Sequence, residues 1–229
     1  MAVNFESYKN IVGELNSKNV TLVAVSKTKS AQEILELYNL GQRDFGENYV
    51  QELVEKYKQL PKDIRWHFIG HLQSNKVKLI APFVYLIHSA DSEKLLKEIN
   101  KQSEKNNRKI DCLLQVHIAE EETKFGFDEK ELDNFFKETL SMNDNGLYKN
   151  ISIVGLMGMA SFTNNINIVK KEFRFLKSLF AKYSTFSILN SQFSILSMGM
   201  SSDYELAIEE GANMVRIGSL LFGKREPKK

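Results

Sequence analysis

Short apolar segments alternate with amphipathic segments eight times along this chain of 229 residues. The first of these segments, residues 20–26, carries apolar side chains on both faces, which is typical of a buried parallel strand. A helical pattern follows each apolar segment, and no linker or internal repeat interrupts the series. Such a series predicts one (β/α)8 TIM barrel over residues 1–229. We place its strands at residues 20–26, 43–46, 66–69, 83–88, 110–118, 151–157, 193–196 and 214–217.

An open, doubly wound sheet is the alternative architecture. The regularity of the repeat favours a closed barrel, and so does the absence of a Gly-x-Gly-x-x-Gly turn after the first strand. Capping-box sequences predict two helix starts, one from Ser30 to Glu33 and the other from Ser202 to Glu205. Gly41 is placed to end the first of these two helices.

Charge and cysteine content exclude several classes of protein. The chain has 31 Lys+Arg and 29 Asp+Glu, a net charge of +2, and the two signs are interleaved, which argues against nucleic-acid binding. The first residues do not read as a leader, and no apolar run is long enough to span a membrane. The single cysteine, Cys112, cannot pair within the chain and reads as a packing residue. We therefore expect a cytoplasmic protein.

A barrel of this type carries its active site where the strands end at their carboxyl side. Lys27 follows the first predicted strand, and Asn48 lies just after the second. Residues 197–201 follow the seventh strand, and residues 216–219 close the eighth. We therefore expect these residues to lie together at the carboxyl end of the barrel, which we call its mouth.

The loops after the seventh and eighth strands are where such barrels commonly bind phosphate. Gly199 and Gly218 would let the backbone approach an anion, and Ser197 and Ser219 would add hydroxyl donors. Residues 220–223 form a candidate short helix whose positive end faces that anion. The alternative is two ordinary Ser/Gly loops without a ligand.

Lys27 and Arg216 are the charged candidates at this mouth. A lysine held at a strand end and partly desolvated suits Schiff-base chemistry, although most lysines are solvated surface charges. Arg216 lies between two apolar residues and needs an acceptor, which could be Glu47 or Asp44 in a purely structural ion pair.

An amine, an anion cup and an arginine together match pyridoxal 5′-phosphate (PLP). Its aldehyde would lie at Lys27, its phosphate in the cup and its ring nitrogen towards Arg216. An arginine at that nitrogen disfavours protonation of the ring, which becomes a weaker electron sink. Such a site suits holding the cofactor or simple proton exchange.

The sequence resembles the pyridoxal phosphate homeostasis protein family, also called the YggS or PROSC family. The matching segments occur in the family's order and span nearly the whole chain. They are AVSKTK (24–29), FGENYVQE (45–52), WHFIGHLQSNK (66–76), HSADS (88–92), GLM (155–157), LSMGMSSDYELAI (196–208) and MVRIGSLLFG (214–223).

The resemblance implies a barrel related to the N-terminal domain of bacterial alanine racemases. It implies that Lys27 holds PLP as a Schiff base, that Arg216 lies by the pyridine nitrogen and that Asn48 lies near the ring. The residues implied around the phosphate are Ser197, Gly218 and Ser219. The resemblance implies a protein that binds and buffers PLP, in a family with no generally accepted reaction. We expect apo PLP-dependent enzymes to be the recipients. His117 departs from the asparagine that members usually carry.

A PLP-dependent enzyme with weak amino-acid racemase activity is the alternative function. Tyr49, His71 or His117 would then act as the second base. The chain ends soon after the eighth predicted strand. We therefore expect it to lack the second domain that supplies a catalytic tyrosine in racemases, and we expect a monomer.

A metal site is the third class of function. His67 and His71 have the i, i+4 spacing of a zinc pair on a helix. Here the pattern predicts a strand followed by a loop, which separates the two rings. We therefore expect no metal.

Overall fold

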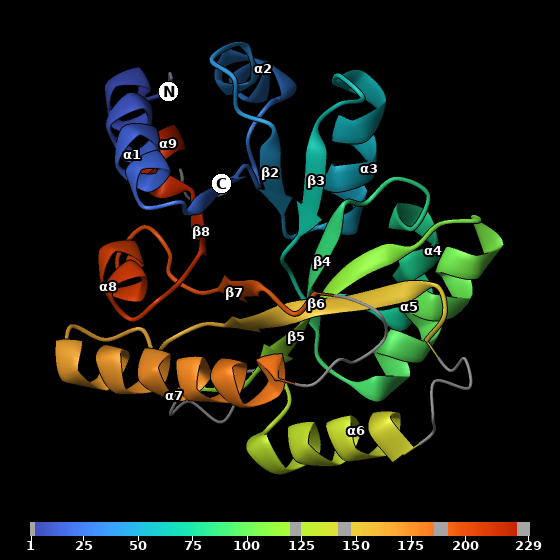
Figure 1. Ribbon diagram of the computed structural model, residues 1–229. Coiled ribbons are helices and arrows are strands. Elements are labelled where there is room, and N and C mark those ends of the chain that lie inside the picture. Colours follow the sequence, from blue (N-terminus) through green and yellow to red (C-terminus); the bar gives the residue numbers. More distant parts are fainter. Residues whose placement is uncertain (1–2, 120–124, 142–147, 186–191, 224–229) are drawn as a thin grey trace.

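Eight parallel strands form a closed barrel, with helices around its outside (Figure 1). The computed structural model describes residues 3–119, 125–141, 148–185 and 192–223. Each strand pairs with the next along the chain, and β8 pairs with β1, Thr21 lying opposite Met214. This closure confirms the predicted TIM barrel and excludes the open sheet. The strands are β1 (Thr21–Val25), β2 (Asp44–Glu47), β3 (Arg65–Phe68), β4 (Leu86–Ala90), β5 (Ile110–Val116), β6 (Ile151–Gly158), β7 (Ile195–Ser197) and β8 (Met214–Ile217).

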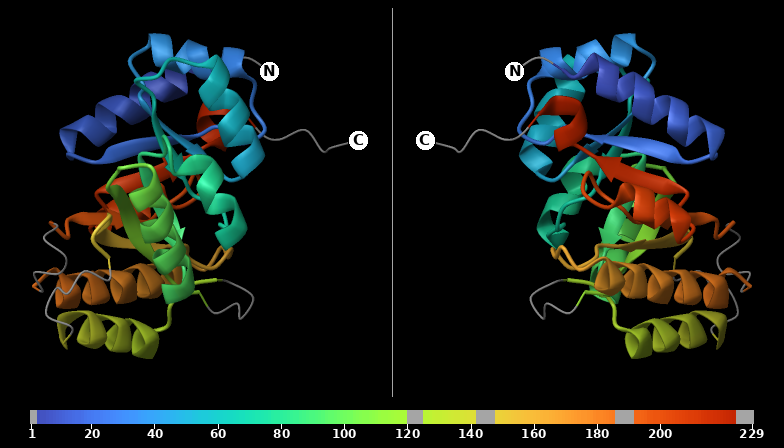
Figure 2. Two further views of the ribbon diagram at one scale, coloured as in Figure 1. Left: turned by 90° about the vertical axis from the view of Figure 1, so that its right-hand side faces the viewer. Right: turned by 90° about the vertical axis from the view of Figure 1, so that its left-hand side faces the viewer.

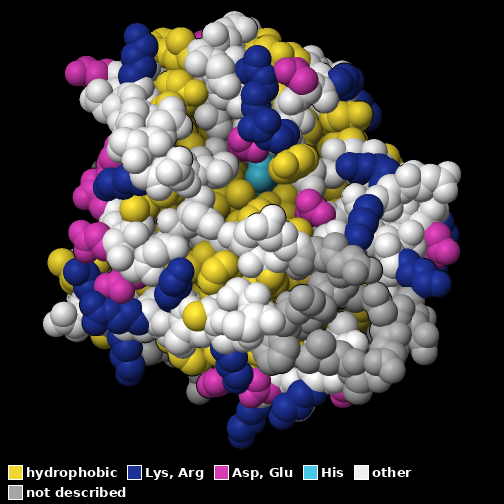
Figure 3. Space-filling model, in the orientation of Figure 1, with side chains coloured by type: hydrophobic (Ala, Val, Ile, Leu, Met, Phe, Trp, Pro, Cys, Tyr) yellow, Lys and Arg dark blue, Asp and Glu magenta, His cyan; other side chains and the backbone are white. Residues whose placement is uncertain are grey.

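The helices cover the outer face of the sheet on all sides (Figure 2). On the face drawn in Figure 3, basic and acidic side chains are interspersed, as they are in the sequence. No helix in the described ranges is long and apolar enough to cross a membrane. The helices are α1 (Phe5–Ser17), α2 (Ala31–Asn39), α3 (Val50–Gln59), the 3-10 turn η1 (Ser74–Lys76), α4 (Val77–Ile80), α5 (Glu93–Lys105), α6 (Glu129–Ser141), α7 (Ile166–Ser184), α8 (Tyr204–Glu209) and α9 (Ser219–Phe222).

Helix α1 precedes the first strand and is absent from the sequence prediction. Asn4 caps its start by accepting a hydrogen bond from the Ser7 amide at 3.0 Å. Its buried face is formed by Tyr8, Ile11 and Leu15, which follow helical spacing. That spacing was present in the sequence and could have revealed the helix.

The two predicted capping boxes have different outcomes. Ser30 and Glu33 form both reciprocal hydrogen bonds at the start of α2, and Gly41 after this helix has a φ of 102°. The second prediction is wrong, because α8 begins at Tyr204 after Asp203, and no side-chain hydrogen bond caps it. Asp203 instead accepts from the Met200 amide at 2.6 Å, which fixes the loop before the helix.

The buried side chains form two layers, one between strands and helices and one inside the barrel. Alternate residues of a strand point to opposite faces, so the layers separate by residue parity. On β8, Val215 and Ile217 pack in the outer layer, which contains most of the apolar core and the buried Cys112. The inner apolar cluster is small and consists of Val23, Leu86, Leu113, Met157 and Met214. The rest of the interior is therefore left to polar side chains.

Candidate binding site at the barrel mouth

A pocket of about 430 Å³ lies at the carboxyl ends of β1, β2 and β8. It brings together five of the residues predicted from the sequence. These residues are Lys27, Asn48, Arg216, Gly218 and Ser219. The wall is completed by apolar side chains that include Val25, Ile69, Met159 and Phe162. The strand-end rule therefore locates the pocket correctly.

Lys27 is half-buried, and the backbone on both sides of it is held in place. The Ser26 amide donates to the Gly46 carbonyl at 3.0 Å, and the Ser26 carbonyl accepts from Lys56 Nζ at 2.8 Å. The Thr28 amide donates to Glu52 Oε2 at 2.9 Å, and Thr28 has a left-handed φ of 65°. Contacts from β2 and α3 thus fix where the Lys27 side chain begins.

A buried ion pair lies behind Lys27. Lys56 Nζ lies 2.7 Å from Glu47 Oε1, and the same carboxylate oxygen accepts from the Ser26 hydroxyl at 2.6 Å. Glu47 is fully buried and Lys56 is 7% exposed. Burial raises the pKa of Glu47 to about 7, although the neighbouring ammonium opposes that shift. Glu47 therefore pairs with Lys56 and does not serve Arg216.

Asn48 carries an unused hydrogen-bonding atom at the pocket. Its Oδ1 is buried and has no hydrogen-bond partner among the residues that the structure describes. The backbone of Asn48 is packed against Gly70, where a Cβ would lie 2.2 Å from the Asn48 carbonyl oxygen. A buried polar atom without a partner is costly, so this amide is suited to bind a ligand.

Arg216 also lines the pocket, from β8, and is 4% exposed. Its Nη1 donates to Ser197 Oγ at 2.7 Å and to the Ser197 carbonyl at 2.9 Å, and its Nη2 donates to the Gly158 carbonyl at 3.0 Å. Burial lowers the pKa of Arg216 to about 10, so the guanidinium stays charged at neutral pH. No salt bridge in the described part of the chain involves it, and the predicted pairing with Asp44 is not formed.

Ser197 and Gly199 do not line the pocket, although sequence reasoning placed both there. Ser197 is the last residue of β7, and its buried hydroxyl lies between Arg216 and His88 Nδ1, 3.2 Å away. Gly199 has a φ of 92°, and its carbonyl accepts from the Arg216 amide at 3.0 Å. Gly199 therefore shapes the loop after β7 and is not among the residues that line the pocket.

Ser201 and Ser202 take the place that was predicted for Ser197. Ser201 Oγ accepts from the Gly218 amide at 3.1 Å and so joins the loop after β7 to the loop after β8. A Cβ at Gly218 would lie 3.2 Å from the Val25 carbonyl oxygen, so the backbone there passes close to β1. The segment 197–201 contains a second serine, Ser201, and sequence reasoning did not consider it as a hydroxyl donor.

The three candidate bases lie outside this pocket. Tyr49 is 53% exposed, and His71 binds Asp91 Oδ2 at 3.1 Å while it stacks on Phe125. The half-buried His117 donates its backbone amide to the Phe127 carbonyl. None of the three residues therefore lines the pocket together with Lys27.

The zinc pair considered for His67 and His71 is not formed. His67 is buried and bonds Asp44 and His88, whereas His71 lies on the surface beside Asp91. Across the ranges that the structure describes, no group of three or more His, Cys, Asp or Glu could hold a metal ion.

Comparison with known proteins gives matches over almost the whole chain. Residues 1–226 match the family model described as "Alanine racemase, N-terminal domain". The pyridoxal phosphate homeostasis protein of Aquifex aeolicus is 42% identical over 210 residues, which cover 90% of this chain and 87% of that protein. Its human counterpart is 38% identical, over 91% of this chain and 78% of that protein.

Solved structures agree with this assignment. PipY of Synechococcus elongatus, solved without PLP, has a TM-score of 0.86 and 34% identity, covering 95% of this chain and 99% of that chain. The same protein solved with PLP bound has a TM-score of 0.80 at 34% identity, over 93% and 99% of the two chains. Alanine racemase from Bartonella henselae, at 17% identity and a TM-score of 0.69, shares the fold over 62% of its length. The chain belongs to the alanine racemase N-terminal domain family and, within it, to the pyridoxal phosphate homeostasis proteins.

Proposed function

We propose that this protein binds PLP at the barrel mouth, holds it on Lys27 and takes part in PLP homeostasis by buffering the cofactor or delivering it. The observation that carries the proposal is the pocket itself, which both Lys27 and Arg216 line. Relatives named for PLP homeostasis and the PLP-bound PipY structure support the same cofactor.

The polar groups of the pocket suit the different parts of PLP. Lys27 offers a primary amine, and Asn48 offers a buried Oδ1 without a partner. Arg216 has five N–H donors, of which Ser197 and Gly158 use three, so two remain for a ring nitrogen. For a phosphate, the loops after β7 and β8 supply the hydroxyls of Ser201 and Ser219 and, at Gly218, a backbone that an anion can approach closely.

Bound PLP supplies an aldehyde and an electron-withdrawing ring. The Lys27 amine would add to the aldehyde carbon, and a C=N bond would form as water leaves. Arg216 stays charged and cannot accept a proton, so it would keep the ring nitrogen unprotonated and weaken electron withdrawal. These residues therefore favour storage over carbanion chemistry.

The absorption spectrum tests the assignment of Lys27. We expect the wild type to gain a visible Schiff-base band with PLP, and Lys27→Ala to show none. Lys58→Ala is the matched control, because Lys58 is an exposed lysine on α3, and it should keep the band. A wild type that stays colourless with added PLP, or a band that persists in Lys27→Ala, would contradict the proposal.

Delivery is the second half of the proposal. We expect the protein to act in the cytoplasm as a monomer and to pass PLP to apo-enzymes. The loaded wild type should restore activity to an apo PLP-dependent enzyme. Lys27→Ala should deliver less, because it cannot retain the cofactor covalently. Equal delivery by the two proteins would remove the role of Lys27 as the storage group.

Weak racemase activity is the competing proposal. Tyr49, His71 and His117 are all absent from the residues that line the described pocket, so it offers none of them as a second base. We therefore expect no α-carbon hydrogen exchange in amino acids beyond the rate that PLP alone produces. Exchange in deuterated solvent measures this directly, and a faster rate with the protein would favour the enzyme.

A further inference from the structure

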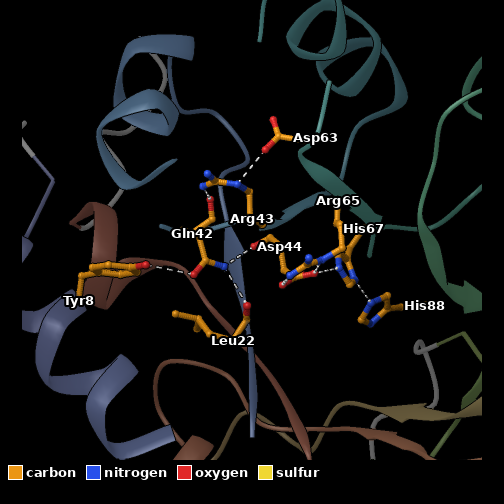
Figure 4. Close-up of polar contacts among 9 residues, drawn as sticks. All are labelled: Tyr8, Leu22, Gln42, Arg43, Asp44, Asp63, Arg65, His67 and His88. Carbon is orange, nitrogen blue, oxygen red and sulfur yellow. Dashed lines mark hydrogen bonds and ion pairs between the residues drawn. The ribbon is translucent and has the colours of Figure 1, made fainter. Parts of the chain in front are cut away.

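A continuous chain of polar side chains crosses the barrel interior from its floor to Arg216. Asp44 Oδ1 lies 3.0 Å from His67 Nε2, and His67 Nδ1 lies 2.9 Å from His88 Nε2 (Figure 4). His88 Nδ1 lies 3.2 Å from Ser197 Oγ, which accepts from Arg216 Nη1. The contacts link β2, β3, β4, β7 and β8 in turn.

Every member of this chain is withdrawn from solvent. His67, His88 and Ser197 are fully buried, Arg216 is 4% exposed and Asp44 is 8% exposed. Strand parity also directs them inwards, because Trp66 and Phe68 on either side of His67 belong to the outer layer. Polar groups inside a barrel destabilise it unless each is paired, so this arrangement needs an explanation beyond packing.

The two ends fix the direction of every hydrogen bond. A guanidinium only donates, and an ionised carboxylate only accepts. Although burial opposes it, hydrogen bonds from Arg65 and His67 lower the pKa of Asp44 to about 2, so the carboxylate is ionised. His67 must then donate from Nε2 to Asp44, and its Nδ1 is left as an acceptor.

The remaining protons follow from that constraint. His88 donates from Nε2 to His67 Nδ1, and its own Nδ1 accepts from the Ser197 hydroxyl. Burial lowers the pKa of both histidines, and for His88 the charge of Arg216 acts in the same direction. Two neutral histidines, both protonated on Nε2, therefore give each contact between Asp44 and Arg216 one donor and one acceptor.

We propose that Asp44, His67, His88 and Ser197 are positioning residues that form a one-directional hydrogen-bond relay and hold Arg216 for the ring nitrogen of PLP. This inference rests on the proposed function of the pocket. The Ser197 hydroxyl donates a hydrogen bond to His88 while its oxygen accepts from Arg216, and His67 and Asp44 hold His88 in the tautomer that accepts from Ser197. The relay thus fixes the orientation of a guanidinium that makes no salt bridge within the described residues.

The tautomers can be read without cofactor, because the chain has only four histidines. In ¹⁵N NMR spectra of the protein without PLP at neutral pH, His67 and His88 should both carry their proton on Nε2 alone. Asp44→Asn should change the ¹⁵N signals of His88 as well as those of His67, although His67 is the only histidine that Asp44 contacts in the described part of the chain. Asp91→Asn is the matched control and should change only His71, which it contacts. A proton on Nδ1 of His67 or His88 would overturn the relay.

PLP retention then tests the positioning role with two variants at one residue. His88→Asn places an acceptor near the site of Nδ1, whereas His88→Gln reproduces only the donor near Nε2. We expect His88→Gln to raise the dissociation constant for PLP about tenfold, the effect of about one lost hydrogen bond, and His88→Asn to raise it less. If His88 only fills space, the smaller asparagine would be the worse substitute.

A third variant covers the case in which His88→Gln does not fold. Ser197→Ala removes the group that joins His88 to Arg216 and should weaken PLP retention to a similar degree. Unchanged retention in Ser197→Ala, or the reversed order of the two His88 variants, would overturn the positioning role. A wild type that bound no PLP would refute the proposed function and this role together, while the NMR spectra would still report whether the relay exists.

Discussion

The two sides of the pocket are supported by different kinds of buried polar group. Behind Lys27 lies an ion pair, with Lys56 Nζ 2.7 Å from the fully buried carboxylate of Glu47. Behind Arg216 lies a run of neutral groups, in which Ser197, His88 and His67 separate the guanidinium from the Asp44–Arg65 ion pair on the barrel floor. We call these supports the lysine side and the arginine side.

This difference predicts how substitutions on each side, and changes of pH, should alter the stability of the protein. A buried ion pair loses much stability when one partner is removed, because an unpaired charge is left in a poor solvent. A neutral relay loses only hydrogen bonds when it is cut. The lysine side also contains a carboxyl whose pKa is raised to about 7, whereas the histidines of the arginine side are uncharged near neutral pH.

The largest expected effect is the loss of the lysine-side ion pair. Lys56→Met should lower the free energy of unfolding by about 3–5 kcal/mol, because Glu47 would be left buried without its partner. His88→Leu, which cuts the arginine side, should cost about 1–3 kcal/mol. Urea denaturation of both variants measures the two losses on one scale.

Two controls make that test specific. Lys58→Met removes a lysine two residues along the same helix, in an exposed pair with Glu55, and should cost less than about 1 kcal/mol. The double variant Lys56→Met/Glu47→Leu should recover much of the loss, because no unpaired charge remains. The comparison of the two sides would fail if Lys56→Met cost no more than His88→Leu.

The two sides should also depend on pH in opposite directions. Glu47 has a pKa of about 7 in the folded chain against 4.5 for the ordinary group, so the folded state binds more protons between these values. The stability from this group is therefore complete below about pH 4.5 and is lost as the pH rises through about 7. His88 has a lowered pKa, so its contribution is present above the ordinary value of about 6.5 and is lost as the pH falls.

A difference measurement separates these opposing contributions. Glu47 lowers the free energy of unfolding as the pH rises from about 5 to about 7, and Glu47→Gln should abolish this fall. The variant should still lose stability as the pH falls and the histidines become protonated. Urea denaturation of the wild type and the variant over this range gives the difference curve. Parallel curves would show that the pKa of Glu47 is not raised in the folded protein.

The fold and the position of the pocket could be predicted from the sequence because both depend on local patterns. Strand residues are apolar on both faces, and Lys27, Asn48 and Gly218 directly follow strands that were correctly placed. Ser197 could not be placed in this way. The predicted strand ended at residue 196, but β7 continues to Ser197, so this side chain faces the interior instead of the loop.

The supports behind the pocket were also beyond local patterns. His88 and Ser197 are 109 residues apart, and His67 and His88 are 21 apart, so their contacts depend on how the strands align around the barrel. Lys56 reads as an ordinary helical lysine, and only the packing of α3 on β2 shows that it is buried. Patterns of one strand or helix carry no information about either contact.

The smallest expected effects come from the two capping-box sequences, one on each side of the pocket. Ser30→Ala should cost about 1 kcal/mol, because the Ser30 hydroxyl accepts from the Glu33 amide at the start of α2. Ser202→Ala should cost almost nothing, because α8 begins after Asp203 and no side chain caps it. Thermal unfolding without PLP compares two serine-to-alanine changes that share one sequence signature. Equal losses would mean that both hydroxyls cap in solution, whereas unequal losses would show that the signature stabilises a helix only where the preceding loop leaves the amide available.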